Sequence, residues 1–184
     1  MDTAQNAPDT ILLAEDEASL YLQATLQVVW HPKGQTPLVT VHPGREHLHF
    51  YAALDLHSGR DLVMRSPVMT AATSALFLDK VLAAYPQRPI LLFWDRAPWH
   101  RGPAIQAVLD ANPRLEIVYF PTAAPDLNPQ EHVWKATREQ LSHNHTEAKL
   151  DRLADRFEQH LTSTVFPCSL LHLHDYHHIC MISK

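Results

Sequence analysis

The hydrophobic positions of this chain first form short runs that favour β-strands. Residues 11–16 (ILLAED) are an apolar run that closes in acid, which predicts a buried strand ending at a site. Residues 47–56 and 61–65 flank the turn sequence HSGR and predict the two arms of an antiparallel hairpin. The continuous apolar runs at 89–94 and 115–120 are typical of strands buried on both faces of a sheet.

The pattern then changes to helical spacing. It predicts helices at residues 73–85, 103–111, 129–143 and 150–161, and a short edge strand is expected at 38–42. Strands with a hairpin therefore come first, followed by helix, strand, helix, strand and helix. This order predicts an α/β fold, in which a mixed sheet starts with an antiparallel hairpin, continues with parallel strands and is flanked by helices.

Three acidic residues stand where such a fold would bring them together. Asp16 is expected at the end of the first strand, Asp95 follows the buried run PILLFW directly, and Glu131 opens a helix. The carboxyl ends of the strands are where open α/β sheets place their ligands. Glu15 and Glu17 flank Asp16, but strand alternation turns both away from its face, so we assign neither to a metal.

Glu131 also has a purely structural interpretation. Asn128 suits the N-cap of the last predicted helix and Pro129 suits its first position. Asn-x-x-Glu is close to a capping box, in which Glu131 would only satisfy the helix terminus. Lys135 and Arg138 follow Glu131 at helical spacing, so they would either contact phosphates or form a solvated face.

The three carboxylates suit phosphodiester chemistry. In-line attack on a phosphodiester builds negative charge on the entering and the leaving oxygen, and two Mg²⁺ ions about 3.5–4 Å apart stabilise both. Mg²⁺ prefers oxygen ligands and keeps several waters, so two or three carboxylates suffice. Either Asp16 or Asp95 is a candidate for the ligand that bridges the two ions.

Composition limits the alternatives. The chain has 184 residues, 46% of them hydrophobic and 19% charged, as in a globular protein of one domain, and no stretch is long and apolar enough for a membrane span. Its two cysteines and the lack of a signal-peptide pattern favour a cytoplasmic protein. The net charge of −5 argues against global electrostatic attraction to DNA, so duplex-binding charge would have to come from another segment.

Several blocks of the sequence resemble one family. AEDEASL, WHPKGQTP, ALDLHSG, FWDRAPWH and above all FPTAAPDLNPQEHVWK are similar to the DDE endonuclease domain of the mariner transposase superfamily, in its bacterial insertion-sequence branch. The blocks keep the family's order from about Ile11 to Arg138, and weaker similarity continues into FPCSLLHLHDYHHIC. The PDLNPQE block is the most specific of them.

The resemblance implies a ribonuclease H-like fold with Asp16, Asp95 and Glu131 as catalytic triad and metal ligands. It also implies Mg²⁺ or Mn²⁺, two ions in all, as cofactor. The implied reaction is DNA cleavage and strand transfer of an insertion sequence, with TA dinucleotides as target. The implied partners are transposon-end DNA and a second protein chain, in a homodimer or larger assembly.

The chain departs from the family pattern in two ways. Only about ten residues precede the first predicted strand, where relatives carry a helix-turn-helix region. We therefore divide the chain into a remnant at 1–10, a catalytic domain at 11–145 and a C-terminal helix and tail at 146–184. A split reading frame would supply the helix-turn-helix from a partner, whereas a truncated copy would be an incomplete fragment that associates with full-length transposase and inhibits it. The second departure is at the position after Asp95, where the family usually has Asn and this chain has Arg96.

Other candidate groups have weaker patterns. Cys168, Cys180 and the histidines at 172, 174, 177 and 178 are zinc-type ligands, but their spacing matches no usual zinc motif. His100 and Arg96 are candidates for DNA contact, with a satisfied surface histidine as the alternative for His100. Trp94 and Trp99 are expected to pack in the core and at the rim of the site.

Overall fold

A five-stranded mixed sheet forms the centre of the chain. The computed structural model describes residues 9–28, 30–34, 38, 43–121 and 125–167. The strands are β1 (Ile11–Tyr21), β2 (His47–Asp55), β3 (Arg60–Ser66), β4 (Ile90–Trp94) and β5 (Leu115–Tyr119), in the order β3-β2-β1-β4-β5. Pairs β1–β2 and β2–β3 are antiparallel, and β1–β4 and β4–β5 are parallel. The predicted sequence of a hairpin followed by parallel strands is confirmed.

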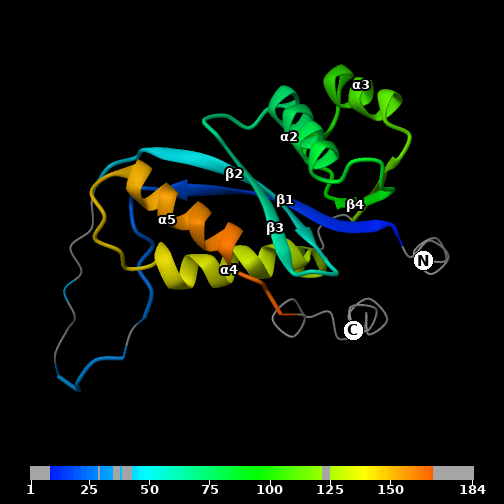
Figure 1. Cartoon of the computed structure of the whole chain (residues 1–184). Helices are drawn as coiled ribbons and strands as arrows, with labels where there is room; N and C mark the ends of the chain where they lie inside the picture. Colours follow the sequence, from blue (N-terminus) through cyan, green and yellow to red (C-terminus); the bar gives the residue numbers. More distant parts are fainter. Residues whose placement is uncertain (1–8, 29, 35–37, 39–42, 122–124, 168–184) are drawn as a thin grey trace.

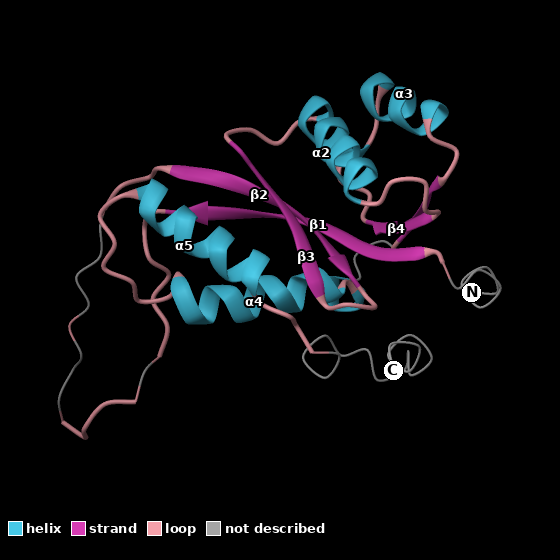
Figure 2. Cartoon of the chain, viewed as in Figure 1, coloured by secondary structure: helices cyan, strands magenta, loops and turns pink. Residues whose placement is uncertain are grey.

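Helices cover both faces of the sheet (Figures 1 and 2). They are α2 (Ala71–Ala84), α3 (Pro103–Ala111), α4 (Pro129–Leu141) and α5 (Leu150–Ser163), close to their predicted bounds. Buried side chains of α2 and α3 form one core cluster with the sheet, and those of α4 and α5 form a second on the opposite face. None of the described helices has the length and apolarity that crossing a membrane requires.

Strand β1 continues well past its predicted end. The prediction that Asp16 ends the first strand is wrong, because β1 pairs with β2 up to Tyr21 opposite His47. Apolar residues resume at Ala18 and Leu20 on the face that Asp16 shares, and both are buried. Asp16 therefore takes an apolar residue's place in the middle of the central strand. The predicted strand at 38–42 lies largely outside the described residues.

The first turn of α4 is tied to two strands. Asn128 accepts a hydrogen bond from the Gln130 backbone N–H at 3.1 Å, which confirms it as the N-cap. Its side-chain amide also donates to the Glu15 carbonyl at 3.1 Å. Gln130 is fully buried and its Nε2 donates to Asp61 Oδ2 on β3 at 3.1 Å. These contacts fix the helix start, and with it Glu131, against the sheet.

The Asp61 contact predicts a pH dependence of stability. Burial raises the pKa of Asp61 to about 7, although the hydrogen bond from Gln130 opposes the shift. The folded state therefore binds a proton more tightly than the unfolded chain does, so this stabilisation is complete below about pH 4 and is lost as pH rises through about 7. Asp61→Asn removes this loss. We expect the variant to match the parent near pH 4 and to exceed it at pH 8 in free energy of unfolding, by a few kcal/mol at most.

Urea unfolding of both proteins at several pH values measures the difference. Asp79→Asn, on the exposed side of α2, is the control and is expected to run parallel to the parent at every pH. A constant difference between Asp61→Asn and the parent from pH 4 to pH 8 would contradict the assigned shift.

Candidate active site

The parallel register of β1 and β4 brings two of the predicted carboxylates to one level of the sheet. Ala14 on β1 pairs with Phe93 on β4. Asp16 and Asp95 each follow two residues later, Asp95 just beyond the end of its strand. Neighbouring strands are about 4.8 Å apart, so the two aspartates are neighbours across the strand pair.

Electrostatics link the third carboxylate to these two. Burial raises the pKa of Asp16 well above its usual range, and the negative charges of Glu131, Glu17 and Asp95 raise it further. The charge of Glu131 is the largest of the three effects. Three elements therefore contribute carboxylates to one region: the middle of β1, the end of β4 and the start of α4.

Glu131 is not used as a helix cap. Asn128 caps the helix alone, and the reciprocal hydrogen bond of a capping box is not among the contacts of α4. No described residue donates a hydrogen bond to the Glu131 side chain, so its carboxylate is left for another partner. The interpretation of Glu131 as part of a capping box is therefore not supported by the contacts of α4.

Trp134 is a site residue to which the sequence analysis assigned no role, although helical spacing places it on the same face as Glu131. Its ring is buried at 1% exposure and its Nε1 donates to Asp16 Oδ2 at 3.1 Å. The contact fixes one carboxylate oxygen and leaves Oδ1 to other ligands. Helical spacing from Glu131 was the available signal, because residues three apart share a helix face.

His100 is bound to Asp95 and is not at the surface. It is 2% exposed, and its ring stacks on Trp94 with centroids 4.0 Å apart. Its Nδ1 lies 2.6 Å from Asp95 Oδ1, and its Nε2 lies 2.8 Å from Glu17 Oε1. The expectation of a surface histidine is corrected, because two carboxylates and an indole ring enclose the imidazole.

These contacts set the charges of the pair. Burial lowers the pKa of His100, but hydrogen bonds to Asp95 and Glu17 outweigh it and raise the pKa to about 9. The hydrogen bond from His100 also lowers the pKa of Asp95, and the Ala97 backbone N–H, 2.8 Å from Oδ1, lowers it further. Asp95 is thus held as a carboxylate, and its side chain is half exposed.

Glu15 and Glu17 face away from Asp16, as alternation predicted, and they meet His100 on the other side of β1. Glu15 is 1% exposed, and neither of its carboxylate oxygens has a hydrogen-bond partner among the described residues. Burial raises its pKa well above the usual range, and the charges of Glu17 and Asp16 add to the shift. Glu15, Glu17 and His100 can each offer one ligand atom to a common point.

The cationic candidates have different surroundings. Lys135 is exposed and Arg138 half-buried on α4. The Arg96 guanidinium lies over the Tyr119 ring at 4.9 Å, a cation–π contact beside Asp95.

Trp94 is 1% exposed, as expected for a core residue. The cysteine- and histidine-rich tail lies outside the described residues.

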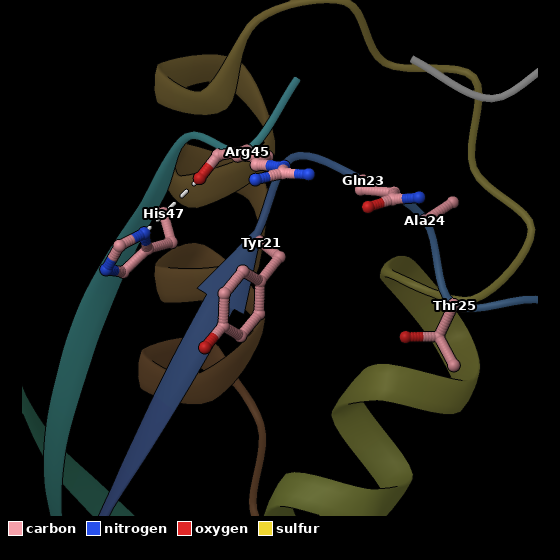
Figure 3. A pocket seen from close by; sticks show the side chains of 6 residues that line it. All are labelled: Tyr21, Gln23, Ala24, Thr25, Arg45 and His47. Carbon is pink, nitrogen blue, oxygen red and sulfur yellow. Dashed lines mark hydrogen bonds between the residues drawn. The ribbon is translucent and has the colours of Figure 1, made fainter. Parts of the chain in front are cut away.

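A hollow of about 500 Å³ lies at the far end of β1, lined by Tyr21, Gln23, Ala24, Thr25, Arg45 and His47 (Figure 3). Tyr21 and His47 stack with centroids 5.2 Å apart, and His47 Nδ1 lies 3.3 Å from the Arg45 carbonyl oxygen. No carboxylate lines it, and Tyr21 is five residues beyond Asp16. This hollow is therefore separate from the carboxylate site.

Known proteins are similar to this chain over most of its length. The chain is 30% identical over 157 residues to the insertion element IS630 uncharacterized 39 kDa protein of Shigella sonnei, an alignment that covers 83% of this chain and 45% of that protein. The chain thus spans about half the length of this curated relative.

Solved structures agree with the observed fold. The Mos1 strand transfer complex superposes with a TM-score of 0.66 at 16% identity, over 94% of this chain and 55% of the Mos1 chain. The Mos1 transposase catalytic domain gives a TM-score of 0.63 at 12% identity, over 94% of this chain and 82% of that domain. The mixed sheet with its flanking helices is therefore the ribonuclease H-like fold, as the sequence resemblance implied.

The family model of the DDE superfamily endonucleases matches residues 12–154, most of the chain. The matched range includes Asp16, Asp95 and Glu131. The chain belongs to the DDE superfamily endonuclease family.

Proposed function

We propose that this chain is the catalytic domain of an insertion-sequence transposase that cleaves DNA phosphodiesters and transfers the resulting strand. Asp16, Asp95 and Glu131 are the proposed catalytic triad and metal ligands. The observation that carries the proposal is the β1–β4 register, which brings Asp16 and Asp95 to one level of the sheet; burial and the charge of Glu131 also oppose the charge of Asp16. The proposed catalytic unit is 11–145, with 146–184 packing on it, and α5 supplies Leu153 and Phe157 to the same core cluster.

The residues fit Mg²⁺ or Mn²⁺. A cluster of like charges around a buried carboxylate is costly unless a cation neutralises it. The available donors are carboxylate oxygens, which both ions prefer. Mos1 paired-end complexes have been solved with Mg and with Mn. We propose two ions, because the reaction develops charge on two oxygens.

Each protein group has a distinct proposed role. Two bound divalent ions would stabilise negative charge on the attacking and leaving oxygens. His100 keeps Asp95 ionised through its Nδ1 contact, and Trp134 holds Asp16 in one orientation through Oδ2. Glu131 closes the site from the start of α4. These contacts preorganise the ligands, so little reorganisation is needed when DNA binds.

DNA is the proposed substrate, as transposon ends and a target of TA dinucleotides. A Mos1 paired-end complex contains the left transposon end, which supports a DNA partner here. Lys135, Arg138 and Arg96 are the proposed phosphate contacts, and they offer positive charge beside the carboxylates. His100 is enclosed, so its proposed influence on DNA binding is indirect.

A second protein chain is the other proposed partner, as a homodimer or as a separate chain that carries the helix-turn-helix. Leu26, Val28, Trp30 and Leu38, on the segment between β1 and β2, are between 64% and fully exposed. Exposed apolar groups gathered on one segment are typical of contact surfaces. The base of this segment is held by the Thr25–His143 bridge to the end of α4.

Removal of the Glu131 carboxylate tests the catalytic assignment. Glu131→Gln keeps the helix and its Asn128 cap, so the variant is expected to fold like the parent. We expect Mn²⁺- or Mg²⁺-dependent nicking of supercoiled plasmid DNA to fall on the order of 100- to 1000-fold, because a ligand for charge stabilisation is lost. Agarose-gel nicking rates with each ion measure the effect.

Glu139→Gln is the matched control, since Glu139 is an exposed glutamate on the same helix. It is expected to keep the parental nicking rate. Nicking that survives in Glu131→Gln at the rate of the control would sink the catalytic assignment. Asp95→Asn is expected to repeat the loss and would exclude an effect confined to α4.

Trp134→Phe tests the positioning of Asp16. The substitution keeps an aromatic ring in the core but removes the Nε1–H that holds Oδ2. We expect the divalent-ion concentration for half-maximal nicking to rise about 10- to 100-fold, as is usual when a partner of a metal ligand is lost. The free energy of unfolding should fall by only about 1 kcal/mol. Unchanged metal dependence, at any stability, would show that Trp134 does not position the ligand.

A further inference from the structure

Glu15, a buried glutamate on the catalytic strand, has no hydrogen-bond partner within the part of the chain that the structure describes. Glu15 is 1% exposed, and neither Oε1 nor Oε2 forms a hydrogen bond with any described residue. A buried carboxylate without compensation costs several kcal/mol, so such groups are normally paired, protonated or bound to a cation. Its position, pointing into a group of other ligand-type side chains, favours the last of these.

Those side chains are Glu17 and His100. Glu15 Oε2 lies 4.0 Å from His100 Nε2, and Glu17 Oε1 lies 2.8 Å from the same nitrogen. All three potential ligand atoms lie within 4.8 Å of one another. In a tetrahedral site with metal–ligand bonds of about 2.1 Å, the ligand atoms lie about 3.4 Å apart. The 2.8 Å and 4.0 Å distances to His100 Nε2 lie on either side of this spacing.

We propose that Glu15, Glu17 and His100 form a second metal site, which holds a transition-metal ion of the Zn²⁺ type on the face of β1 opposite to Asp16. The side chains of all three ligands are at most 3% exposed, so the ion would be largely enclosed. A structural ion in this position would neutralise the charge of the glutamates.

The ligand set determines the class of ion. One imidazole nitrogen with carboxylate oxygens suits Zn²⁺, whereas Mg²⁺ strongly prefers oxygen ligands and octahedral geometry. This separates the second site from the proposed catalytic site, where all three ligands are carboxylates. Zn²⁺ is therefore expected to occupy the second site even in a large excess of Mg²⁺.

The second site would also act on Asp95. Metal-bound histidines usually donate their other ring N–H to a carboxylate, which fixes the tautomer. His100 Nδ1 already lies 2.6 Å from Asp95 Oδ1, while its Nε2 faces the glutamates. An ion on Nε2 would thus keep the Nδ1 proton directed at Asp95 and maintain the orientation of this carboxylate.

Zinc binding under competition tests the proposal. The purified chain, Glu15→Gln and Asp16→Asn are dialysed to equilibrium against limiting Zn²⁺ with excess Mg²⁺, and bound zinc is measured by mass spectrometry. We expect one enclosed zinc ion in the parent and in Asp16→Asn, and at least about tenfold weaker binding in Glu15→Gln. Glu116→Gln, an exposed glutamate on β5, is the control and should bind like the parent.

X-ray absorption at the zinc edge of the parent gives a readout that does not depend on how any variant folds. One imidazole nitrogen with oxygen ligands is the expected first shell. Zinc bound equally by Glu15→Gln and the parent, zinc lost in Asp16→Asn instead, or no zinc at all would overturn the proposal. Such an outcome would leave Glu17 and His100 as a buried ion pair.

The test is separate from that of the proposed function. Nicking of DNA by the parent, and its loss in Glu131→Gln, test the Asp16 face of β1 and are measured without added zinc. Zinc retention in Asp16→Asn, with loss in Glu15→Gln, tests only the opposite face, which carries Glu15, Glu17 and His100. Each result can therefore fail while the other stands.

Discussion

Three consecutive acids in the middle of a buried strand are the constraint on which the rest of this structure depends. Glu15, Asp16 and Glu17 lie on β1, where they pair with β2 and directly follow the stretch that pairs with β4, and helices cover both faces of the sheet. A strand in this position would ordinarily carry apolar residues throughout. The fold therefore has to accommodate acidic side chains on both faces, and it does so with different chemistry on each.

The face toward α4 leaves its carboxylate ready for a ligand. Trp134 gives Asp16 a neutral hydrogen bond, which orients the group and leaves its charge uncompensated. Glu131 adds a second negative charge where α4 begins, and raises the pKa of Asp16. A fold selected only for stability would place a lysine or arginine here, and no such side chain contacts Asp16 among the described residues. The arrangement is one that an external cation completes.

The sequence predicted the elements well because each has a local signal. Apolar runs and helical spacing located the strands and helices, and PILLFW followed directly by Asp95 identified the carboxyl end of a central strand. Strand β1 was predicted too short because three acids interrupt its alternation, and only pairing with β2 reveals that it continues. His100 was misplaced for a related reason, since its burial depends on Glu17, 83 positions away in the sequence. Contacts between distant residues leave no pattern in one sequence.

His100 links the two faces of the strand. His100 follows Asp95 by five residues, and the short 3-10 helix Pro98–His100 brings its ring back to the carboxyl end of β4. One ring nitrogen then meets Asp95 and the other meets Glu17, and stacking on Trp94 holds the plane of the ring. A change in charge at Glu17 therefore alters the electrostatic environment of the Asp95 carboxylate, because the His100 ring contacts both groups. The buried acids of β1 thus set the charge and orientation of Asp95, the proposed catalytic ligand.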